Sequence, residues 1–421
     1  MGRGAPMVSE SELATTPALR WWPLLAVWGP GLLVMLADTD AGSLITAAQS
    51  GAEWGYRMIV PQLLLIPILY VVQEVTVRLG LVTGEGHGAA IRRQFGTGWA
   101  MVSAGTLFLA AIGALITEFS GVAGVGALFG LPPAVSVGGA TLLLILVGLS
   151  GSYQKVERIG ILMGLFELGF VGVATLAHPS GSELVGRGLA MPIQDPRYLK
   201  LLAANVGAVI MPWMIFYQQG AVVDKGLKAS PATLRHLRWD TAAGSVITQL
   251  VMAAMVVAVA ATVGRAHPGA SLDTVQEISQ SLVPFLGQGA GRVVFGLGML
   301  GASLVAALVV SVAGSWGLGE VLGFNHSLNH RLHEAPWFYA VYTAAHVGGA
   351  LLVIFSADLV GLTIDVEVMN AVLLPVVLGF LLALEARALP PGWRMRGAYR
   401  WMVWLLSGLV MAFGLFTVTT L

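Results

Sequence analysis

Eleven apolar stretches, each long enough to cross a lipid bilayer, dominate this 421-residue chain. A helix needs about 20 apolar residues to span the hydrocarbon core. Hydrophobic residues make up 56% of the sequence and charged residues 10%, which is more apolar surface than a soluble core encloses. The sequence therefore predicts an all-α polytopic membrane protein. The expected spans are Pro23–Gln49, Met58–Val77, Trp99–Leu128, Ala134–Leu149, Ile159–Ala177, Leu199–Val223, Ala242–Val263, Val293–Trp316, Trp337–Phe355, Val366–Leu384 and Met402–Leu421.

The connections between these spans are short, so we expect a single transmembrane domain over residues 23–421, preceded by a polar tail over residues 1–22. The tail has no apolar core of the kind found in a signal peptide. Lys and Arg concentrate on the cytoplasmic side of membrane proteins. With the N-terminus inside, 16 of the 22 Lys and Arg residues fall on the inner side. The bias predicts a multi-pass protein of the cell (inner) membrane, with a cytoplasmic N-terminus and an external C-terminus.

Several classes of function are disfavoured by composition. The chain has no cysteine, which excludes disulfides, thiolate metal sites and iron–sulfur clusters. Its formal net charge of +0 argues against binding to nucleic acid. No resident cofactor and no obligate protein partner are evident. The lipid bilayer is the one surrounding that the composition requires.

Two spans are interrupted near their middles. The first contains "ADTDAGS" (residues 37–43), and the sixth contains "GAVIMPWMIFYQQG" (residues 207–220), in which Pro212 removes a backbone donor. The interruptions lie five spans apart, as in transporters whose two inverted repeats each begin with a broken helix. We therefore expect a LeuT-like fold with two inverted five-helix repeats, about 23–178 and 198–386, plus an eleventh helix.

The first interruption carries two carboxylates at a depth where an ionised Asp costs at least about 2.5 kcal/mol. Asp38 and Asp40 are therefore predicted to be functional rather than decorative. Ser43 adds a hydroxyl one helical turn beyond Asp40, and the sixth-span break frees a carbonyl at Ala208. Met211 adds a thioether beside Pro212, although methionine is usually a core filler. Together these groups predict a cation site.

The same residues carry a resemblance to a known family. The stretch "GPGLLVMLADTDAGSLITAAQSGAEWGY", followed by "VRLGLVTG" at the end of the second span, resembles the opening of the Nramp family of divalent metal transporters. The sixth-span segment "GAVIMPW" resembles the Ala-x-x-Met-Pro-His segment of that family. The total of eleven spans also fits. The resemblance implies a secondary transporter of divalent metal ions.

Five positions take roles from this resemblance. Asp40 matches the metal-binding aspartate of the family's Asp-Pro-Gly-Asn motif, Gly42 the glycine and Ser43 the asparagine. Ala208 would supply a carbonyl oxygen and Met211 the thioether. The implied metal ligands are thus Asp40, Ser43, Ala208 and Met211.

The departures from the family pattern concern the proton route. Glu118 matches the third-span glutamate near that route, but Leu115 stands where the family commonly has a proton-accepting aspartate. The ninth span has no arginine of the kind that partners the route. Ala41 replaces the motif's proline, Trp213 replaces the histidine after Met-Pro, and Asp38 is an additional carboxylate. We therefore expect a divergent branch with weak or absent proton coupling, and such branches include members that resemble magnesium transporters.

The choice of ion is left between three metals. A thioether favours manganese or iron over magnesium, whereas the extra carboxylate of Asp38 and the short side chain of Ser43 suit a larger, partly hydrated magnesium. Manganese accepts both kinds of ligand and is ranked first. The expected mechanism is uptake into the cytoplasm by alternating access. An accessory role along the ion path is expected for Asp38, Gly42, Trp213, Glu118 and Glu367.

Other polar residues favour less specific interpretations. Glu167 in the fifth span is expected to form an interhelical hydrogen bond. His326 and His330 are four residues apart, with His333 nearby, a spacing that could bind metal on one helix face. Beside basic residues, a solvated loop is the favoured interpretation of this segment.

Two alternatives remain open at this stage. One is a sodium-coupled transporter of a small organic solute on the same LeuT-like scaffold, which Asp40 disfavours because an acidic residue repels a substrate carboxylate. The other is a membrane-embedded enzyme, for which no nucleophile–base pair or complete metalloprotease motif is present. The sequence therefore predicts a transporter and not an enzyme.

Overall fold

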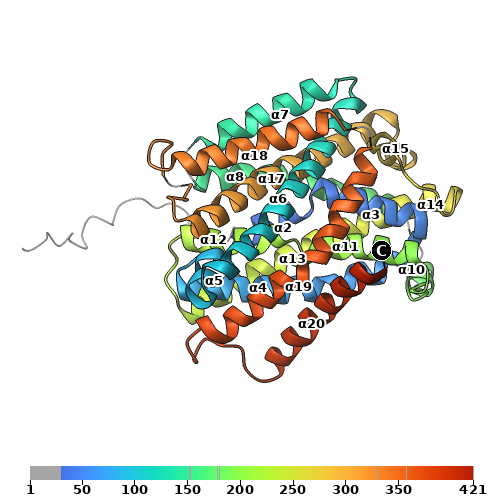
Figure 1. Ribbon diagram of the computed structural model, residues 1–421. Helices are drawn as coiled ribbons and strands as arrows, with labels where there is room; N and C mark the ends of the chain where they lie inside the picture. The colour runs from blue at the N-terminus through green and yellow to red at the C-terminus, as the bar shows by residue number, and fades with distance from the viewer. Residues whose placement is uncertain are drawn as a thin grey trace, which may run out of the picture.

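The computed structural model describes residues 30–150, 153–177, 179, 181–328, 330–356 and 358–420. The predicted polar tail over residues 1–22 lies outside these ranges, as does the start of the first expected span. Within them, every regular element is a helix. Most of these helices run along a common direction from one end of the molecule to the other (Figure 1).

The helices of the described ranges account for the eleven expected spans. Nine stretches have the length and hydropathy of a membrane span, α7 is a shorter apolar helix, and the first of the nine stretches contains both α3 and α4. The spans are α2 (Pro30–Asp38) with α3 (Ala41–Trp54), α4 (Ile59–Thr83), α6 (Thr97–Leu128), α7 (Pro133–Gly148), α8 (Tyr153–Gly164) with the 3₁₀ turn η3 (Leu165–Leu168) and α9 (Gly169–Leu176), α11 (Pro196–Val209) with α12 (Pro212–Asp224), α13 (Pro231–Ala261), α17 (Gln288–Leu322), α18 (Pro336–Ile354), α19 (Leu359–Ala388) and α20 (Gly397–Thr420).

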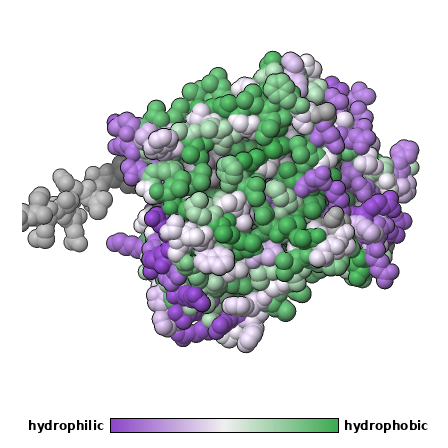
Figure 2. Space-filling model, viewed as in Figure 1, coloured by the Kyte–Doolittle hydropathy of each residue, from purple (hydrophilic) through white to green (hydrophobic). Residues whose placement is uncertain are grey.

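Short helices occupy several connections, and the sequence patterns did not predict them. They are η2 (Gly55–Met58), α5 (His87–Phe95), α10 (Gly181–Gly188), α14 (Val263–Ala266), α15 (Val275–Gln280) and α16 (Val283–Leu286). In Figure 1, α5 lies at one end of the molecule, and α10 and α14 lie at the other. Figure 2 shows hydrophilic residues at these two ends and a broad hydrophobic band between them, as expected for a protein that crosses a bilayer.

The start of the seventh span was predicted wrongly. Helix α13 begins at Pro231 rather than at Ala242. Ser230 caps this helix by accepting a hydrogen bond from the Thr233 N–H, and proline is well suited to the first helical position. Hydropathy detects the part of a helix inside lipid, so it misses polar turns that extend beyond the bilayer.

The packing encloses both interrupted spans. Helix α13 packs against α2, α3 and α4, helix α11 packs against α19, and α6 packs along α17. Asp240 on α13 accepts hydrogen bonds from the Gly31 and Leu32 N–H groups, at 2.8 and 3.2 Å. These donors lie in the first turn of α2, where N–H groups lack partners within the helix. The interruptions therefore lie in the interior of the bundle, away from lipid.

Candidate metal-binding site

The first interruption separates α2 from α3 at Thr39 and Asp40. Asp40 has an extended backbone and caps α3, because its carboxylate accepts a 2.6 Å hydrogen bond from the Ser43 N–H. An Asp at the N-cap satisfies one of the helix's free N–H donors, and its extended backbone prevents α2 from continuing into α3. The other carboxylate oxygen of Asp40, Oδ2, is buried without a hydrogen-bond partner. The break thus presents a carboxyl oxygen to which no backbone N–H and no basic side chain of the described residues donates.

The second interruption separates α11 from α12 at Ile210 and Met211. Pro212 stands at the first position of α12, so its missing N–H costs no helical hydrogen bond there. The Trp213 indole N–H donates to the Met211 thioether at 3.1 Å, and both side chains are fully buried. The Met211 sulfur, which would bind a metal through its lone pairs, therefore already accepts a hydrogen bond from Trp213, the residue that replaces the family's histidine.

The two interruptions meet through Ser43. Its hydroxyl lies 2.8 Å from the Asp38 carbonyl oxygen and 2.9 Å from the Ala208 carbonyl oxygen. Both carbonyls belong to helix ends, where the chain lacks its usual internal donors. About two turns beyond Ser43 on α3 and one turn before Ala208 on α11, Asn205 donates to the Ser50 hydroxyl at 2.7 Å. The structure therefore brings three of the predicted ligand residues, Asp40, Ser43 and Ala208, to one place.

Two glycines allow Glu367 on α19 to approach this place. A Cβ on Gly42 would lie 2.2 Å from Glu367 Oε1, and a Cβ on Gly207 would lie 1.8 Å from the Glu367 carbonyl oxygen. A side chain at Gly42 would displace the Glu367 carboxylate, and one at Gly207 would displace the α19 backbone. Asn370 donates to Glu367 Oε2 at 3.0 Å, whereas Oε1 is buried without a partner. Glu367 thus joins the predicted site from a third helix.

Glu118 on α6 completes the set of predicted residues at the break. Its Oε2 accepts a 3.1 Å hydrogen bond from the Ala41 N–H, which is one of the free donors at the start of α3. Its Oε1 lies 3.2 Å from the Thr117 hydroxyl. The Glu118 carboxyl also interacts with that of Asp40. Glu118 therefore lies at the first break beside Asp40. We call the buried residues that meet here the centre: Asp38, Asp40, Ser43, Glu118, Met211, Trp213 and Glu367.

The electrostatics of the centre are those of a site lacking a counter-charge. The charged groups that act on its carboxyls are all acidic in the described part of the chain. Among the described residues, no three His, Cys, Asp or Glu side chains are arranged to hold a metal by themselves. The predicted ligand set is of another kind, because it combines one carboxylate with a hydroxyl, a carbonyl and a thioether. The side chains of the centre are all at most 1% exposed: Asp38, Asp40, Ser43, Glu118, Met211, Trp213 and Glu367.

Glu167, for which an interhelical hydrogen bond was expected, lies at the first break. This residue lies in η3, which interrupts the fifth span between α8 and α9, and its carboxyl approaches the Thr39 hydroxyl at the first break. Among the described residues, no backbone N–H and no basic side chain donates to either of its oxygens. A carboxylate in an apolar span was the available signal, but sequence spacing does not show which neighbouring helix it faces.

The histidine loop agrees with the favoured interpretation. In the described ranges, α17 ends at Leu322 and α18 begins at Pro336, so His326, His330 and His333 share no helix face. The His326 ring bonds the Phe324 carbonyl oxygen at 2.7 Å, and the Tyr339 hydroxyl donates to the His330 carbonyl oxygen. These contacts are those of a structured turn.

A second polar assembly lies at the α5 end of the bundle. Glu320 on α17 accepts a 2.7 Å hydrogen bond from the Gly88 N–H, in the first turn of α5. The His87 ring donates through Nδ1 to the Gln219 Oε1 on α12 at 2.9 Å. Burial lowers the pKa of His87 to about 4, against the opposing effect of this hydrogen bond. His87 is therefore neutral near pH 7. Helix α5 thus contacts α12 through the His87–Gln219 hydrogen bond and α17 through the hydrogen bond from the Gly88 N–H to Glu320.

A family model described as "Natural resistance-associated macrophage protein-like" matches residues 31–420. The chain belongs to the Nramp family. A divalent metal cation transporter, MntH of Xanthomonas campestris, is 25% identical over 345 residues, covering 80% of this chain and 76% of its own length. The manganese transporter of Eremococcus coleocola has the same fold, with a TM-score of 0.77 and 17% identity over 97% of this chain and 89% of that one.

The fold extends beyond the family. A sodium-coupled sialic acid symporter matches with a TM-score of 0.63 and 14% identity, covering 94% of this chain and 89% of that one. These similarities confirm the LeuT-like fold with inverted repeats. This Nramp chain is a membrane transporter and not an enzyme.

Proposed function

We propose that this chain moves divalent metal cations into the cytoplasm by alternating access, with manganese as the first candidate and iron or magnesium as further ones. The observation that carries the proposal is the free oxygen of Asp40 at the meeting point of two broken helices. An uncompensated carboxylate is costly inside a membrane protein, and a bound cation offsets that cost. The match to MntH, named as a divalent metal cation transporter, supports the same substrate class.

The proposed ligands differ in hardness. Asp40, Ser43 and the Ala208 carbonyl offer oxygen, and Met211 offers sulfur. Oxygen suits manganese and magnesium alike, whereas a thioether adds little to a hard ion such as magnesium. Manganese uses the whole set, so it is ranked first. Glu367 adds a further oxygen from α19 at the same place, as an accessory group on the ion path.

Alternating access is supported by the closure of the centre. The ligand residues are buried, so an ion reaches them only if helices move. The two breaks interrupt the regular helical hydrogen bonds, so the half-helices can tilt while their own internal hydrogen bonds stay intact. We propose that α2, α3, α11 and α12 move relative to the rest of the bundle and expose the site first outside and then inside.

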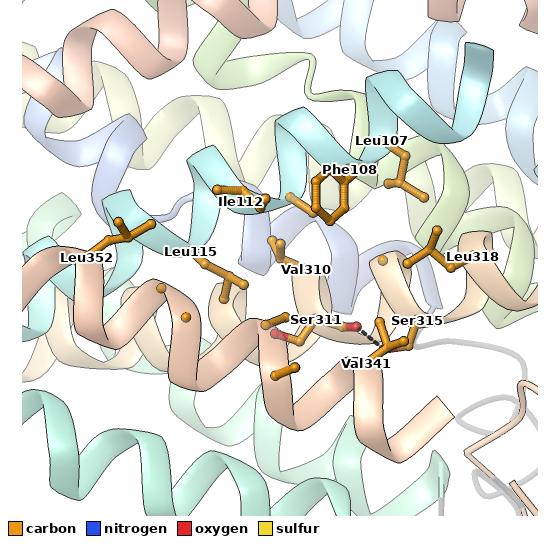
Figure 3. A pocket seen from close by; sticks show the side chains of 16 residues that line it. Leu107, Phe108, Ile112, Leu115, Val310, Ser311, Ser315, Leu318, Val341 and Leu352 are labelled. Carbon is orange, nitrogen blue, oxygen red and sulfur yellow. Dashed lines mark hydrogen bonds between the residues drawn. The ribbon is translucent and has the colours of Figure 1, made fainter. Parts of the chain in front are cut away.

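Weak or absent proton coupling is supported by a cavity of about 370 Å³ between α6, α17 and α18. Leu115 lines this cavity together with apolar side chains and two serines, as Figure 3 shows. The lining contains no titratable residue. Leu115 occupies the position at which the family commonly carries a proton-accepting aspartate, so α6 presents hydrocarbon to the cavity where the family presents a carboxylate.

We further propose a location and orientation. The positive-inside bias favours the cell membrane with the N-terminus in the cytoplasm and the C-terminus outside. The α5 end of Figure 1 is then the cytoplasmic end, and the α14 end faces outward. The proposed transport domain spans 23–421, with repeats over about 23–178 and 198–386.

The test is transport into liposomes that contain the purified protein, with one dye for manganese and one for protons. We expect manganese to enter down its gradient while the internal pH stays constant. Magnesium and iron are then added as competitors to rank the ions. Internal acidification that follows metal entry would contradict the uncoupled mechanism, and the absence of any divalent metal flux would contradict the function itself.

A further inference from the structure

Glu167 is a buried carboxylate that the proposed metal site does not use. It lies in η3, where the fifth span departs from regular α-helix between α8 and α9. The side chain is fully buried, and its carboxyl faces the Thr39 hydroxyl, with no backbone N–H or basic group among the described residues donating to it. Burying a carboxylate without a partner costs far more than a hydrogen bond returns elsewhere. An ionised Glu167 therefore needs a counter-ion that the described residues do not supply.

The groups next to Glu167 are all oxygen donors. Its carboxyl approaches Thr39, and the Thr39 hydroxyl lies 2.5 Å from the Thr248 hydroxyl on α13. Thr248 in turn lies 3.5 Å from Asp38 Oδ2, while Asp38 Oδ1 is buried without a partner. Contacts thus connect Glu167 through the two threonines to Asp38 at the first break. Each threonine hydroxyl has two lone pairs, so it can also bind a cation.

The charge balance favours a monovalent ion here. Glu167 and Asp38 lie close enough to interact with each other and with Asp40, and the groups acting on Glu167 include no base among the described residues. A doubly charged ion bound at Asp40 would repel a second doubly charged ion four times as strongly as unit charges repel, but a monovalent ion only twice as strongly. A hard monovalent cation with oxygen ligands is sodium.

We propose that Glu167, the Thr39 and Thr248 hydroxyls and the free oxygen of Asp38 bind a sodium ion beside the divalent metal site. The ion ties η3 and α13 to the junction of α2 and α3, the same junction that must move during alternating access. Sodium binding therefore stabilises one arrangement of the first broken helix. This inference goes beyond the transport of divalent metals, and its choice of a monovalent ion rests on the proposed binding of a divalent metal at Asp40.

The test is the thermal unfolding of the purified, full-length protein in detergent, with EDTA to remove divalent metals. Choline chloride replaces sodium chloride so that the ionic strength stays constant. The 12 tryptophans of the chain provide the fluorescence signal. We expect the unfolding midpoint to rise with sodium and to saturate. In Glu167→Gln, the sodium concentration for half-maximal stabilisation should increase about tenfold or more, because a charge–charge interaction in a low-dielectric interior is lost.

Three further variants make the result decisive. Glu385→Gln alters another buried carboxylate, which accepts a hydrogen bond from the Met395 N–H near the end of α19, and should keep the wild-type sodium response. Thr248→Val removes one proposed ligand and should weaken the response if Glu167→Gln does not fold. Asp40→Ala should lose stabilisation by manganese but keep stabilisation by sodium, so failure of the metal site and failure of the sodium site are distinguished.

Two outcomes would overturn the proposal. An unchanged sodium response in both Glu167→Gln and Thr248→Val would remove the site. Stabilisation that follows pH but not sodium, and that disappears in Glu167→Gln, would mean that Glu167 binds a proton instead.

Discussion

Two buried carboxylate sites in this molecule are treated in opposite ways. Glu74 on α4 is fully buried and contacts three partners: Arg78 at 2.6 Å, the Arg238 guanidinium on α13 at 2.7 Å, and the Tyr399 hydroxyl on α20 at 2.8 Å. Asp40 is equally buried, but it interacts with other acids and leaves one oxygen without a partner. The chain thus neutralises one buried acid with its own arginines and leaves the other open.

The difference separates a structural acid from a functional one. A carboxylate that fastens helices together needs a permanent counter-ion, because removing water from it is otherwise too costly. A carboxylate that binds a transported cation must be without a permanent partner, since an arginine would compete with the substrate. We therefore expect the proposed site to lower the stability of the empty protein, and a bound metal to restore it.

Replacing Asp40 by Ala should produce the largest effect on transport. The variant removes the one carboxylate among the proposed ligands, and uptake of every divalent metal into liposomes should fall about a hundredfold or more. Asp365→Ala is the matched control, because Asp365 is an exposed aspartate on α19 that pairs with Lys200. Retained manganese uptake in Asp40→Ala would remove the proposed site, and with it the functional side of the comparison.

Replacing Glu74 by Gln should produce the largest effect on stability. It leaves buried Arg78 without its carboxylate, and breaking a buried ion pair costs about 3–5 kcal/mol. We expect the lower part of this range, because the Arg238 side chain is 38% exposed and recovers contact with water. The measurement is the unfolding midpoint in denaturant, with manganese uptake per folded molecule as the control. Wild-type stability in Glu74→Gln would show that the arginines do not stabilise the fold.

Replacing Asp38 by Asn should have the opposite sign. In metal-free and sodium-free buffer, removing one of the unneutralised acids should stabilise the protein by about 1–2 kcal/mol. Asn keeps an oxygen to accept from Thr248, so that contact is preserved. Chemical denaturation of Asp38→Asn beside wild type measures this gain. A loss of stability would mean that Asp38 supports the fold as Glu74 does.

Local sequence signals predicted the part of the site that depends on chain chemistry. Asp40 and Ser43 are within one turn, where an Asp caps a helix, and Pro212 starts a helix because it lacks an N–H. Both breaks followed from these residues, and the five-span spacing predicted the LeuT-like fold. The close contact of Ser43 with Ala208 follows from the symmetry of that fold.

Contacts between helices far apart in sequence could not be predicted in this way. The position of Glu167 beside Thr39 depends on how the fifth span turns about its axis at η3. Glu74 and Arg78 are four residues apart and predict a pair, but the addition of Arg238 requires the packing of α13 on α4. Hydropathy measures how apolar a span is, and it contains no information on which face meets which neighbour.

The smallest expected effect concerns the preference between manganese and magnesium. It tests whether the Met211 sulfur is available to a bound metal. The Trp213 indole N–H occupies part of the Met211 sulfur, so the thioether is less available to a metal than its position suggests. Trp213→Phe removes this donor while keeping an aromatic ring. A net hydrogen bond contributes about 1 kcal/mol, so the preference for manganese over magnesium should rise about threefold to fivefold. Competition between the two ions for uptake measures the ratio. Because magnesium gains little from sulfur, its own uptake should stay constant.

Met211→Leu should lower the ratio of manganese to magnesium uptake, and combining it with Trp213→Phe should abolish the gain. An equal gain in the presence and absence of Met211 would mean that Trp213 acts through pocket size, and that the thioether takes no part in selecting the ion.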